Sequence, residues 1–319
     1  MPEKYIKKFK KLRSDSNQNP WSSTTLNNAP LKSLLLMSVI DLFAQGRIKG
    51  TFIEHSYELV DTFNAYCSSV ISDADEKSMA YPFPRLSNDN IWTLVPKPDY
   101  SKTINIESVF SMVKLRKVSD GAEIDDVFCS MLSNPDSREL IRSTLMEKYF
   151  APVVHPLIKE QADINMKAFA YSKDILKTQG RAEPFDVGNP IDKKARVKAF
   201  QKIIADLYDH RCAFCGVRML TSEGCSLVEA AHIIPWQKSK DDHPTNGISL
   251  CKVCHWAFDN GMITVGNDYE IIVSKRVNDD ENSPGHVIEL SGRQILKPKD
   301  KRLWSGQDNL GWHRGNVFC

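Results

Sequence analysis

Residues 212–261 read CAFCGVRMLTSEGCSLVEAAHIIPWQKSKDDHPTNGISLCKVCHWAFDNG. The stretch contains two CxxC pairs, which are separated by 35 residues. The four cysteines are Cys212, Cys215, Cys251 and Cys254. Four thiolates in two such pairs can close a tetrahedral Zn²⁺ site that has no open coordination position. The spacing therefore predicts a structural zinc site, with His232 and Asn246 in the insert between the two pairs.

Three polar residues occur in this order along or just after the two cysteine pairs: His232, Asn246 and His255. Leu227–Ala231 is short and mostly apolar, which predicts a strand that ends at His232. An imidazole can take a proton from water at cellular pH, and phosphodiester hydrolysis needs an activated water and a cation near the phosphate. We therefore expect His232 to be a general base. His255, which lies next to Cys254, is the candidate ligand of a catalytic divalent ion.

Asn246 precedes Gly247 in a turn-like stretch, and we expect its amide to orient His232. The order His, Asn, His, together with the four cysteines, A-H-I-x-P, N-G and H-x-x-F-D-x-G, resembles the zinc-knuckle branch of the HNH (ββα-metal) nuclease family. The resemblance implies a DNA endonuclease with a structural Zn²⁺ and a catalytic Mg²⁺ or Mn²⁺. A purely structural zinc module is the alternative.

One position departs from the pattern of many HNH nucleases, which carry an acidic metal ligand directly before the first histidine. Ala231 occupies that position here. Glu229 lies two residues earlier and points to the same side of the strand, so it is a substitute candidate. His243 fits no motif position. Asp259 is expected to shape the end of a helix or to support His255.

The composition fits a water-soluble protein of two domains: the chain has 319 residues, of which 41% are hydrophobic and 26% are charged. No apolar run approaches 18 residues, and the basic N-terminus is not followed by the apolar segment of a secretory signal. The other cysteines are scattered along the chain: Cys67, Cys129, Cys225 and Cys319. These features favour a reduced, cytoplasmic location and no membrane partner.

The net charge of +2 is small for a DNA-binding protein, so any basic surface must be local. The N-terminal sequence MPEKYIKKFKKLR places lysines and apolar residues at helical spacing. It predicts an amphipathic helix whose basic side faces DNA or, equally, only solvent.

The periodicity predicts an α+β protein with an α-rich N-terminal half. The expected helices there are Ser33–Ala44, Ser56–Ser69, Ile124–Leu132 and Arg138–Tyr149, with a short hairpin that ends near Val95. Further expected elements are the helices His155–Lys177 and Arg196–His210, a linker over Thr178–Pro190 and a strand over Tyr269–Val273. The predicted domains are a recognition domain at 1–150, a helical linker at 151–195 and a nuclease domain at 196–319.

Five fragments within residues 1–150 carry a second resemblance: Y-I-K-K-F-K-K-L-R, A-P-L-K-S-L-L-L-M-S-V-I-D-L, Y-P-F-P-R-L, I-W-T-L-V-P-K-P and R-E-L-I-R-S-T-L-M-E-K-Y-F. They resemble the sulfur-binding domain of some restriction endonucleases, which recognises DNA with a phosphorothioate backbone. The resemblance implies that Tyr81 and Pro82 form a socket for sulfur, and that Lys32 and Arg85 meet the DNA backbone. Leu31 stands where these domains commonly have histidine. For the segment Tyr81-Pro82-Phe83, ordinary packing at a loop is the alternative to a sulfur socket.

Together these features predict a modification-dependent restriction endonuclease of type IV that hydrolyses double-stranded, phosphorothioate-modified DNA in defence against foreign DNA. One alternative is an HNH endonuclease that recognises unmodified or otherwise modified DNA. A second is a DNA-binding regulator with a decayed nuclease. Double-strand cuts by one site per chain would favour two chains acting together, so a homodimer is also compatible with the sequence.

Overall fold

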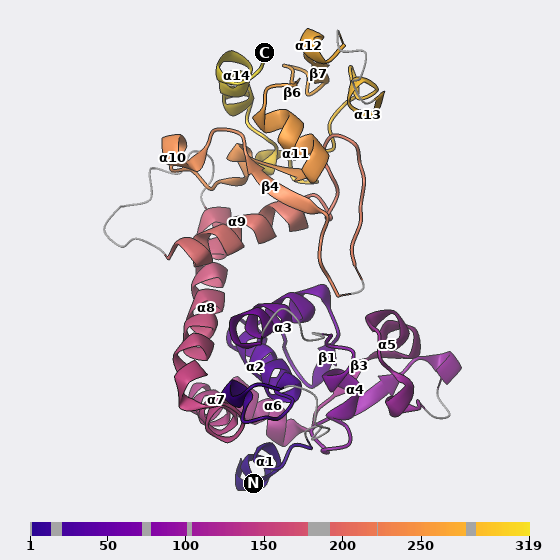
Figure 1. Cartoon of the computed structure of the whole chain (residues 1–319), viewed down its shortest axis with the longest axis vertical. Helices are drawn as coiled ribbons and strands as arrows, with labels where there is room; N and C mark the ends of the chain where they lie inside the picture. Colours follow the sequence, from indigo (N-terminus) through magenta and orange to yellow (C-terminus); the bar gives the residue numbers. More distant parts are fainter. Residues whose placement is uncertain are drawn as a thin grey trace. The chain divides into compact units, whose positions relative to one another are not determined.

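The computed structural model describes residues 2–13, 21–71, 78–100, 104–177, 192–221, 223–278 and 285–319. The chain divides into two compact units (Figure 1). Unit 1 comprises Met1–Met166 and Ser222–Cys225, and unit 2 comprises Lys167–Thr221 and Ser226–Cys319. The division falls inside helix α8 (His155–Lys177), within the segment 151–195 that was expected to join the domains. The expected linker Thr178–Pro190 lies outside the described residues.

Unit 1 is built around helix α2 (Leu31–Ala44), whose residues are buried almost without exception, as its apolar composition predicts. Helix α3 (Tyr57–Val70) begins where Ser56 accepts a hydrogen bond from the backbone N–H of Leu59, a typical N-cap. Further helices of this unit are α4 (Pro82–Arg85), α5 (Met112–Val118), α6 (Asp126–Ser133) and α7 (Pro135–Tyr149). The expected helices of the N-terminal half are therefore confirmed, with shifted ends.

The sheet of unit 1 differs from the expected local hairpin. Its strands are β1 (Phe52–Glu54), β2 (Thr93–Pro96) and β3 (Ser119–Glu123), in the antiparallel order β1-β3-β2. The prediction of a local hairpin that ends near Val95 was wrong, because β2 pairs with β3, a strand further along the chain. No turn in the local sequence indicates that pairing. Gly121 lies in the central strand, where a Cβ atom would come within 2.5 Å of the carbonyl oxygen of Ile53.

Helix α1 (Pro2–Phe9) is amphipathic, as its sequence predicts. Tyr5 and Phe9 are buried in the core of unit 1, where both rings pack on Phe128. The hydroxyl of Tyr5 donates a hydrogen bond to Asp125, which also caps helix α6. The apolar face of α1 therefore anchors the helix and leaves its lysines on the opposite side.

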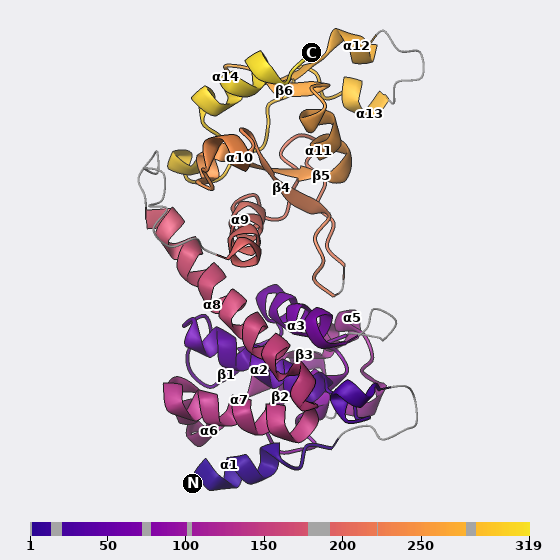
Figure 2. The ribbon, with the colours of Figure 1, turned by 60° about the vertical axis from the view of Figure 1, so that its left-hand side comes forward.

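Unit 2 contains an antiparallel strand pair, β4 (Val228–His232) and β5 (Gly247–Cys251), as predicted for the strand that ends at His232. Helix α9 (Lys193–Leu207) and helix α11 (Lys252–Asp259) contact this pair on opposite sides (Figures 1 and 2). Residues alternate between the faces of a strand. One face of β4 is therefore turned toward α9 and the other toward α11.

Gly247 opens β5 opposite His232 and has an extended backbone. A Cβ atom there would lie 2.4 Å from Cδ1 of Ile204 and 3.0 Å from Cζ of Phe200, both on α9. The N-G dipeptide is thus not a hairpin turn, because Asn246 ends the 3₁₀ helix η5 (Pro244–Asn246) and Gly247 is the first strand residue. A larger residue at this position would require the side chains of Ile204 and Phe200 to move.

The rest of unit 2 surrounds this centre. Its elements are α10 (Trp236–Ser239), β6 (Ile263–Val265), β7 (Ile271–Val273), α12 (Lys275–Asn278), α13 (Gly285–Ile288) and α14 (Gln307–Asn316). β6 and β7 form an antiparallel pair, and β7 confirms the strand expected over Tyr269–Val273. Among the helices within the described residues, none is long and apolar enough to span a bilayer.

Candidate active site and metal centre

The four predicted cysteines converge in unit 2. Cys212 and Cys215 lie in a tight turn after α9, Cys251 ends β5, and Cys254 lies in the first turn of α11. Their Sγ atoms all lie within 4.8 Å of one another, and those of Cys215 and Cys251 are 3.8 Å apart. Tetrahedral zinc with Zn–S bonds of about 2.3 Å requires sulfur atoms about 3.8 Å apart. The cluster could therefore bind zinc.

His232 occupies the end of β4, as predicted, and is fixed by two contacts. Its ring stacks on Phe200 of α9, with centroids 3.8 Å apart and an interplanar angle of 12°. Its Nε2 lies 2.7 Å from Oδ1 of Asp242, which the sequence analysis did not select. The side chain is 21% exposed. An imidazole that is held in place yet open to solvent can accept a proton from a bound water.

Asn246 does not orient His232, so that part of the prediction was wrong. Its fully buried side chain accepts a hydrogen bond from the backbone N–H of Ile234 and donates to the carbonyl oxygens of Ile234 and Asp241. The amide thus ties the loop after β4 to the loop before β5. Asn246 holds the backbone that presents His232, and the contact with the imidazole comes from Asp242.

His255 lies on α11 between two carboxylates. Its Nδ1 is 3.0 Å from Oε2 of Glu229, and its Nε2 is 3.4 Å from Oδ2 of Asp259. Burial raises the pKa of Asp259, an effect that His255 opposes and the nearby Glu229 reinforces. Both carboxylates are substantially exposed, at 44% for Glu229 and 58% for Asp259. The site is therefore open to water and to a phosphate.

The same three residues fit a divalent ion only in part. The carboxylates approach different nitrogens of His255, so one ion can share His255 with Glu229 or with Asp259 but not with both as they are placed. Within the described ranges, the four cysteines form the one group of three or more ligand residues whose donor atoms all lie within 4.8 Å. Glu229 points to the same side of β4 as Ala231, about 7 Å further back along the strand. It can thus supply the oxygen donor that Ala231 lacks.

Two other histidines in unit 2 have structural roles. His243 is buried, and its Nδ1 accepts a hydrogen bond from the N–H of Thr245 at the start of η5. His313 stacks on Phe258, with centroids 3.7 Å apart, and its Nδ1 lies 2.9 Å from Oγ1 of Thr264. The C-terminal segment that carries His313 therefore packs on the domain.

The burial of His313 predicts a pH-dependent stability. Burial lowers its pKa from 6.5 to about 4. The unfolded chain therefore binds the proton first, and the contribution of this residue, complete above about pH 6.5, falls as the pH decreases toward 4. Between pH 7 and pH 5 the loss should be about 2 kcal/mol. Unfolding free energies of the wild-type protein and of His313→Gln, measured at both pH values, test this. An equal loss in both proteins would contradict it.

In unit 1 three of the four predicted recognition residues, Lys32, Tyr81 and Arg85, line one cavity of about 310 Å³. The lining residues come from separate segments of unit 1: Arg13, Ala29, Leu31, Lys32, Tyr81, Arg85, Asn88 and Glu107. Pro82 is not among them, because it is buried as the first residue of α4. The cavity thus brings together Leu31, Lys32 and Tyr81, whereas Pro82 is buried and does not line it.

Arg85 is placed differently from a phosphate-binding arginine. The residue is 6% exposed, and its guanidinium donates hydrogen bonds to the carbonyl oxygens of Tyr81, Val109 and Glu107. It also lies 4.1 Å from the centre of the Tyr81 ring. The expected contact between Arg85 and the DNA backbone is therefore not supported, since its donors are already used. Arg85 instead fixes the ring of Tyr81 at the cavity.

Lys32 is also paired, since its Nζ lies 2.5 Å from Oδ2 of Asp89. A phosphate at this cavity would have to compete with that carboxylate. A second cavity, of about 590 Å³, lies along α1 and shares Arg13 and Asn88 with the first. Asp89, the partner of Lys32, lines only this second cavity. Four lysines line it: Lys4, Lys7, Lys8 and Lys11. These four lysines form a basic groove. Positive charge is therefore concentrated locally, although the net charge of the chain is only +2.

Comparison with known proteins bears directly on unit 2. Residues 212–266 match the family described as HNH endonuclease. The matched segment contains the cysteine cluster and also His232, Asn246 and His255. No curated protein matches the chain.

A solved structure described as "Modification dependent TagI restriction endonuclease" is similar to part of the chain. The two are 21% identical, with a TM-score of 0.30, over 43% of this chain and 44% of that protein. The chain therefore spans less than half the length of that enzyme in the comparison.

Proposed function

We propose that the chain is a divalent-metal-dependent DNA endonuclease. One observation carries the proposal: in a segment that matches HNH endonucleases, His232 is held at a strand end with its ring accessible, and His255 lies beside Glu229. A bound Mg²⁺ or Mn²⁺ would stabilise the charge that develops on the phosphate. His255 and Glu229 are the residues that would hold it, and both lie at the exposed edge of β4 and α11.

In this mechanism His232 takes a proton from the attacking water as the new P–O bond forms. The bond between phosphorus and the leaving sugar oxygen breaks, and that oxygen takes a proton from solvent. Asn246 keeps the loop after β4 in place through its three backbone contacts. The four cysteines would hold Zn²⁺, which would fix the junction of β5 and α11 and thereby the position of His255.

We further propose that unit 1 directs the nuclease to phosphorothioate-modified, double-stranded DNA. The support is the cavity that Tyr81, Leu31 and Lys32 line beside the basic groove of α1. Sulfur is larger and less well hydrated than oxygen, so an apolar wall can prefer it. Arg13 reaches both cavities and is exposed, which makes it a stronger candidate for phosphate contact than Arg85.

A Tyr81→Ala substitution should reduce the preference for phosphorothioate duplex over its all-oxygen counterpart. Removal of one apolar contact to sulfur should cost on the order of 1 to 3 kcal/mol on the modified duplex and little on the other. Titration of both duplexes with the full chain, in a His232→Ala background to prevent cleavage, measures the two affinities.

Tyr57→Ala is the matched control for this titration, because Arg116 lies over the Tyr57 ring at 4.3 Å and neither residue lines the cavity. The control variant should keep the full preference. Equal affinities of the parent protein for both duplexes would contradict the sulfur specificity while leaving the nuclease assignment intact, because that assignment depends on residues of unit 2.

A further inference from the structure

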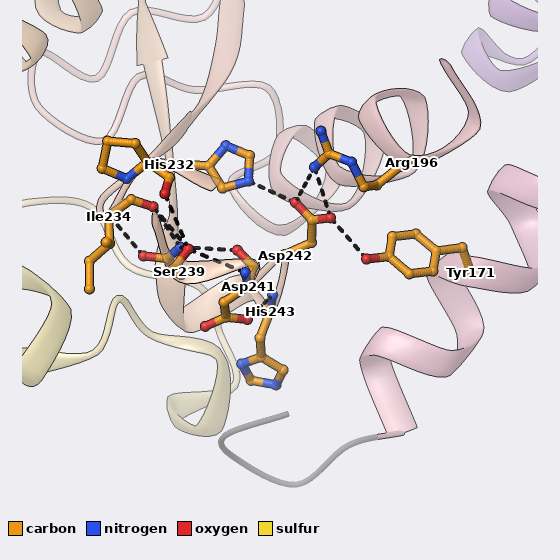
Figure 3. A network of polar contacts seen from close by, with 10 residues as sticks. Tyr171, Arg196, His232, Ile234, Ser239, Asp241, Asp242 and His243 are labelled. Atoms are coloured by element: carbon orange, nitrogen blue, oxygen red, sulfur yellow. Dashed lines mark hydrogen bonds and ion pairs between the residues drawn. The ribbon is translucent and has the colours of Figure 1, made fainter. Parts of the chain in front are cut away.

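Asp242 of unit 2 is a buried carboxylate with hydrogen-bond partners on both of its oxygens. The side chain of Asp242 is 1% exposed and lies among Tyr171, Arg196 and His232 (Figure 3). Arg196 of α9 donates to both carboxylate oxygens, at 2.9 and 3.0 Å. The hydroxyl of Tyr171, on α8, donates to Oδ2 at 2.8 Å. Each oxygen of the carboxylate thus has two hydrogen-bond partners: Arg196 and His232 at Oδ1, and Arg196 and Tyr171 at Oδ2.

These contacts keep Asp242 ionised. Burial alone would raise its pKa, but hydrogen bonds from His232, Arg196 and Tyr171 outweigh burial and leave the pKa below its ordinary value. The guanidinium of Arg196 already balances the negative charge, and its other face lies 3.9 Å from the centre of the Trp236 ring. The carboxylate therefore needs only a neutral donor from His232.

The geometry at His232 follows from this arrangement. An ionised carboxylate can only accept hydrogen bonds, so Nε2 of His232, at 2.7 Å from Oδ1, must carry a proton. In the neutral ring Nδ1 is then the unprotonated nitrogen. In the part of the chain that the structure describes, no protein group is hydrogen-bonded to Nδ1. Stacking on Phe200 prevents the ring from tilting away.

We infer that Asp242 is a positioning residue for the nuclease reaction: it holds His232 in the Nε2-protonated form, with Nδ1 directed outward as the proton acceptor. The inference rests on the proposed function and extends it to a residue outside the expected His, Asn and His set. As His232 takes a proton from water, Asp242 also stabilises the imidazolium that forms. Asp242 itself neither touches the DNA nor accepts the proton.

A double-mutant cycle in the full chain tests the inference. Asp242→Asn keeps the size of the side chain but removes its charge, and it should slow single-turnover DNA cleavage at saturating enzyme by about 10- to 100-fold, the usual effect of losing the partner that orients a functional histidine. The apparent affinity for DNA should stay unchanged. In a His232→Ala background the same substitution should cause no further loss, since Asp242 acts through His232.

Tyr208→Phe is the control for a merely structural role, because it removes one buried hydrogen bond of unit 2, between the Tyr208 hydroxyl and Oγ of Ser305, without touching Asp242 or His232. It should leave the cleavage rate within about twofold of the wild type, since the contacts of Asp242 and His232 remain. Wild-type cleavage by Asp242→Asn, or an equal loss of rate with and without His232, would overturn the inference but not the nuclease assignment. Equal cleavage by wild-type protein and His232→Ala would overturn both.

A measurement on the unmodified protein covers the case in which Asp242→Asn fails to fold. Nitrogen-15 NMR of histidine-labelled wild-type protein, with His232 assigned by comparison with His232→Ala, reports which ring nitrogen is protonated. The inference requires a proton on Nε2 and none on Nδ1 at neutral pH. A proton on Nδ1 alone would overturn it.

Discussion

A Cys251→Ala variant should contain no stoichiometric zinc and should lose the folded structure of unit 2. Structural zinc contributes about 10 kcal/mol or more in small zinc-binding modules, which is comparable with the whole stability of a typical domain. Cys251 ends β5 and directly precedes α11, so loss of the ion frees the strand that pairs with β4 and the helix that carries His255. Elemental analysis and thermal unfolding monitored by circular dichroism measure both effects.

Cys225→Ala is the matched control, because Cys225 is an exposed cysteine outside the cluster. This variant should retain zinc and the wild-type melting temperature. A wild-type protein that contains no zinc, or a Cys251→Ala variant that melts as the wild type does, would contradict the assignment of a structural metal to the four cysteines.

The second large effect concerns His232. His232→Ala should cleave DNA at least about a hundredfold more slowly than the wild type, the lower end of the usual contribution of a general base. Zinc content and melting temperature should change little, because the side chain is partly exposed and lies outside the cysteine cluster. Single-turnover rates measure the loss. His286→Ala, which removes an exposed histidine on α13, should cleave at the wild-type rate.

The cysteine cluster and the strand before His232 could be predicted because their signals are local. Two CxxC pairs specify both the ligands and the approximate geometry of a zinc site, whatever the chain does between them. The same holds for α2, where a long apolar run can only be a buried element. In these cases residue type and spacing leave few alternatives.

The partner of His232 could not be predicted because it depends on tertiary contacts. Asp242 stands in the polar stretch K-S-K-D-D-H-P, where an exposed turn is the natural expectation. It is buried because Arg196 and Tyr171, on α9 and α8, come together around it. A contact between residues 71 positions apart in the chain leaves no local pattern. The motif contains Asn246 but not Asp242, so the sequence led us to expect that Asn246 orients the imidazole of His232.

The predicted contact between Arg85 and the DNA backbone is not supported, for a related reason. The resemblance of Y-P-F-P-R-L to the sulfur-binding domain implied that Arg85 meets the DNA backbone. In the fold, the carbonyl oxygens of Val109 and Glu107 approach from another segment and take up its donors. Whether an arginine is free to bind a ligand depends on such distant acceptors, which the local sequence does not specify.

The most direct test of the nuclease assignment is incubation of the zinc-loaded full chain with phosphorothioate-modified and unmodified supercoiled plasmids, with Mg²⁺ or Mn²⁺ and with EDTA. The proposed site predicts nicked or linear products only when the divalent ion is present, and more product from the modified plasmid. Cleavage of both plasmids at equal rates would remove the proposed specificity alone. If both plasmids stay supercoiled with either ion, in a preparation that binds DNA and contains zinc, the chain is not the endonuclease proposed here.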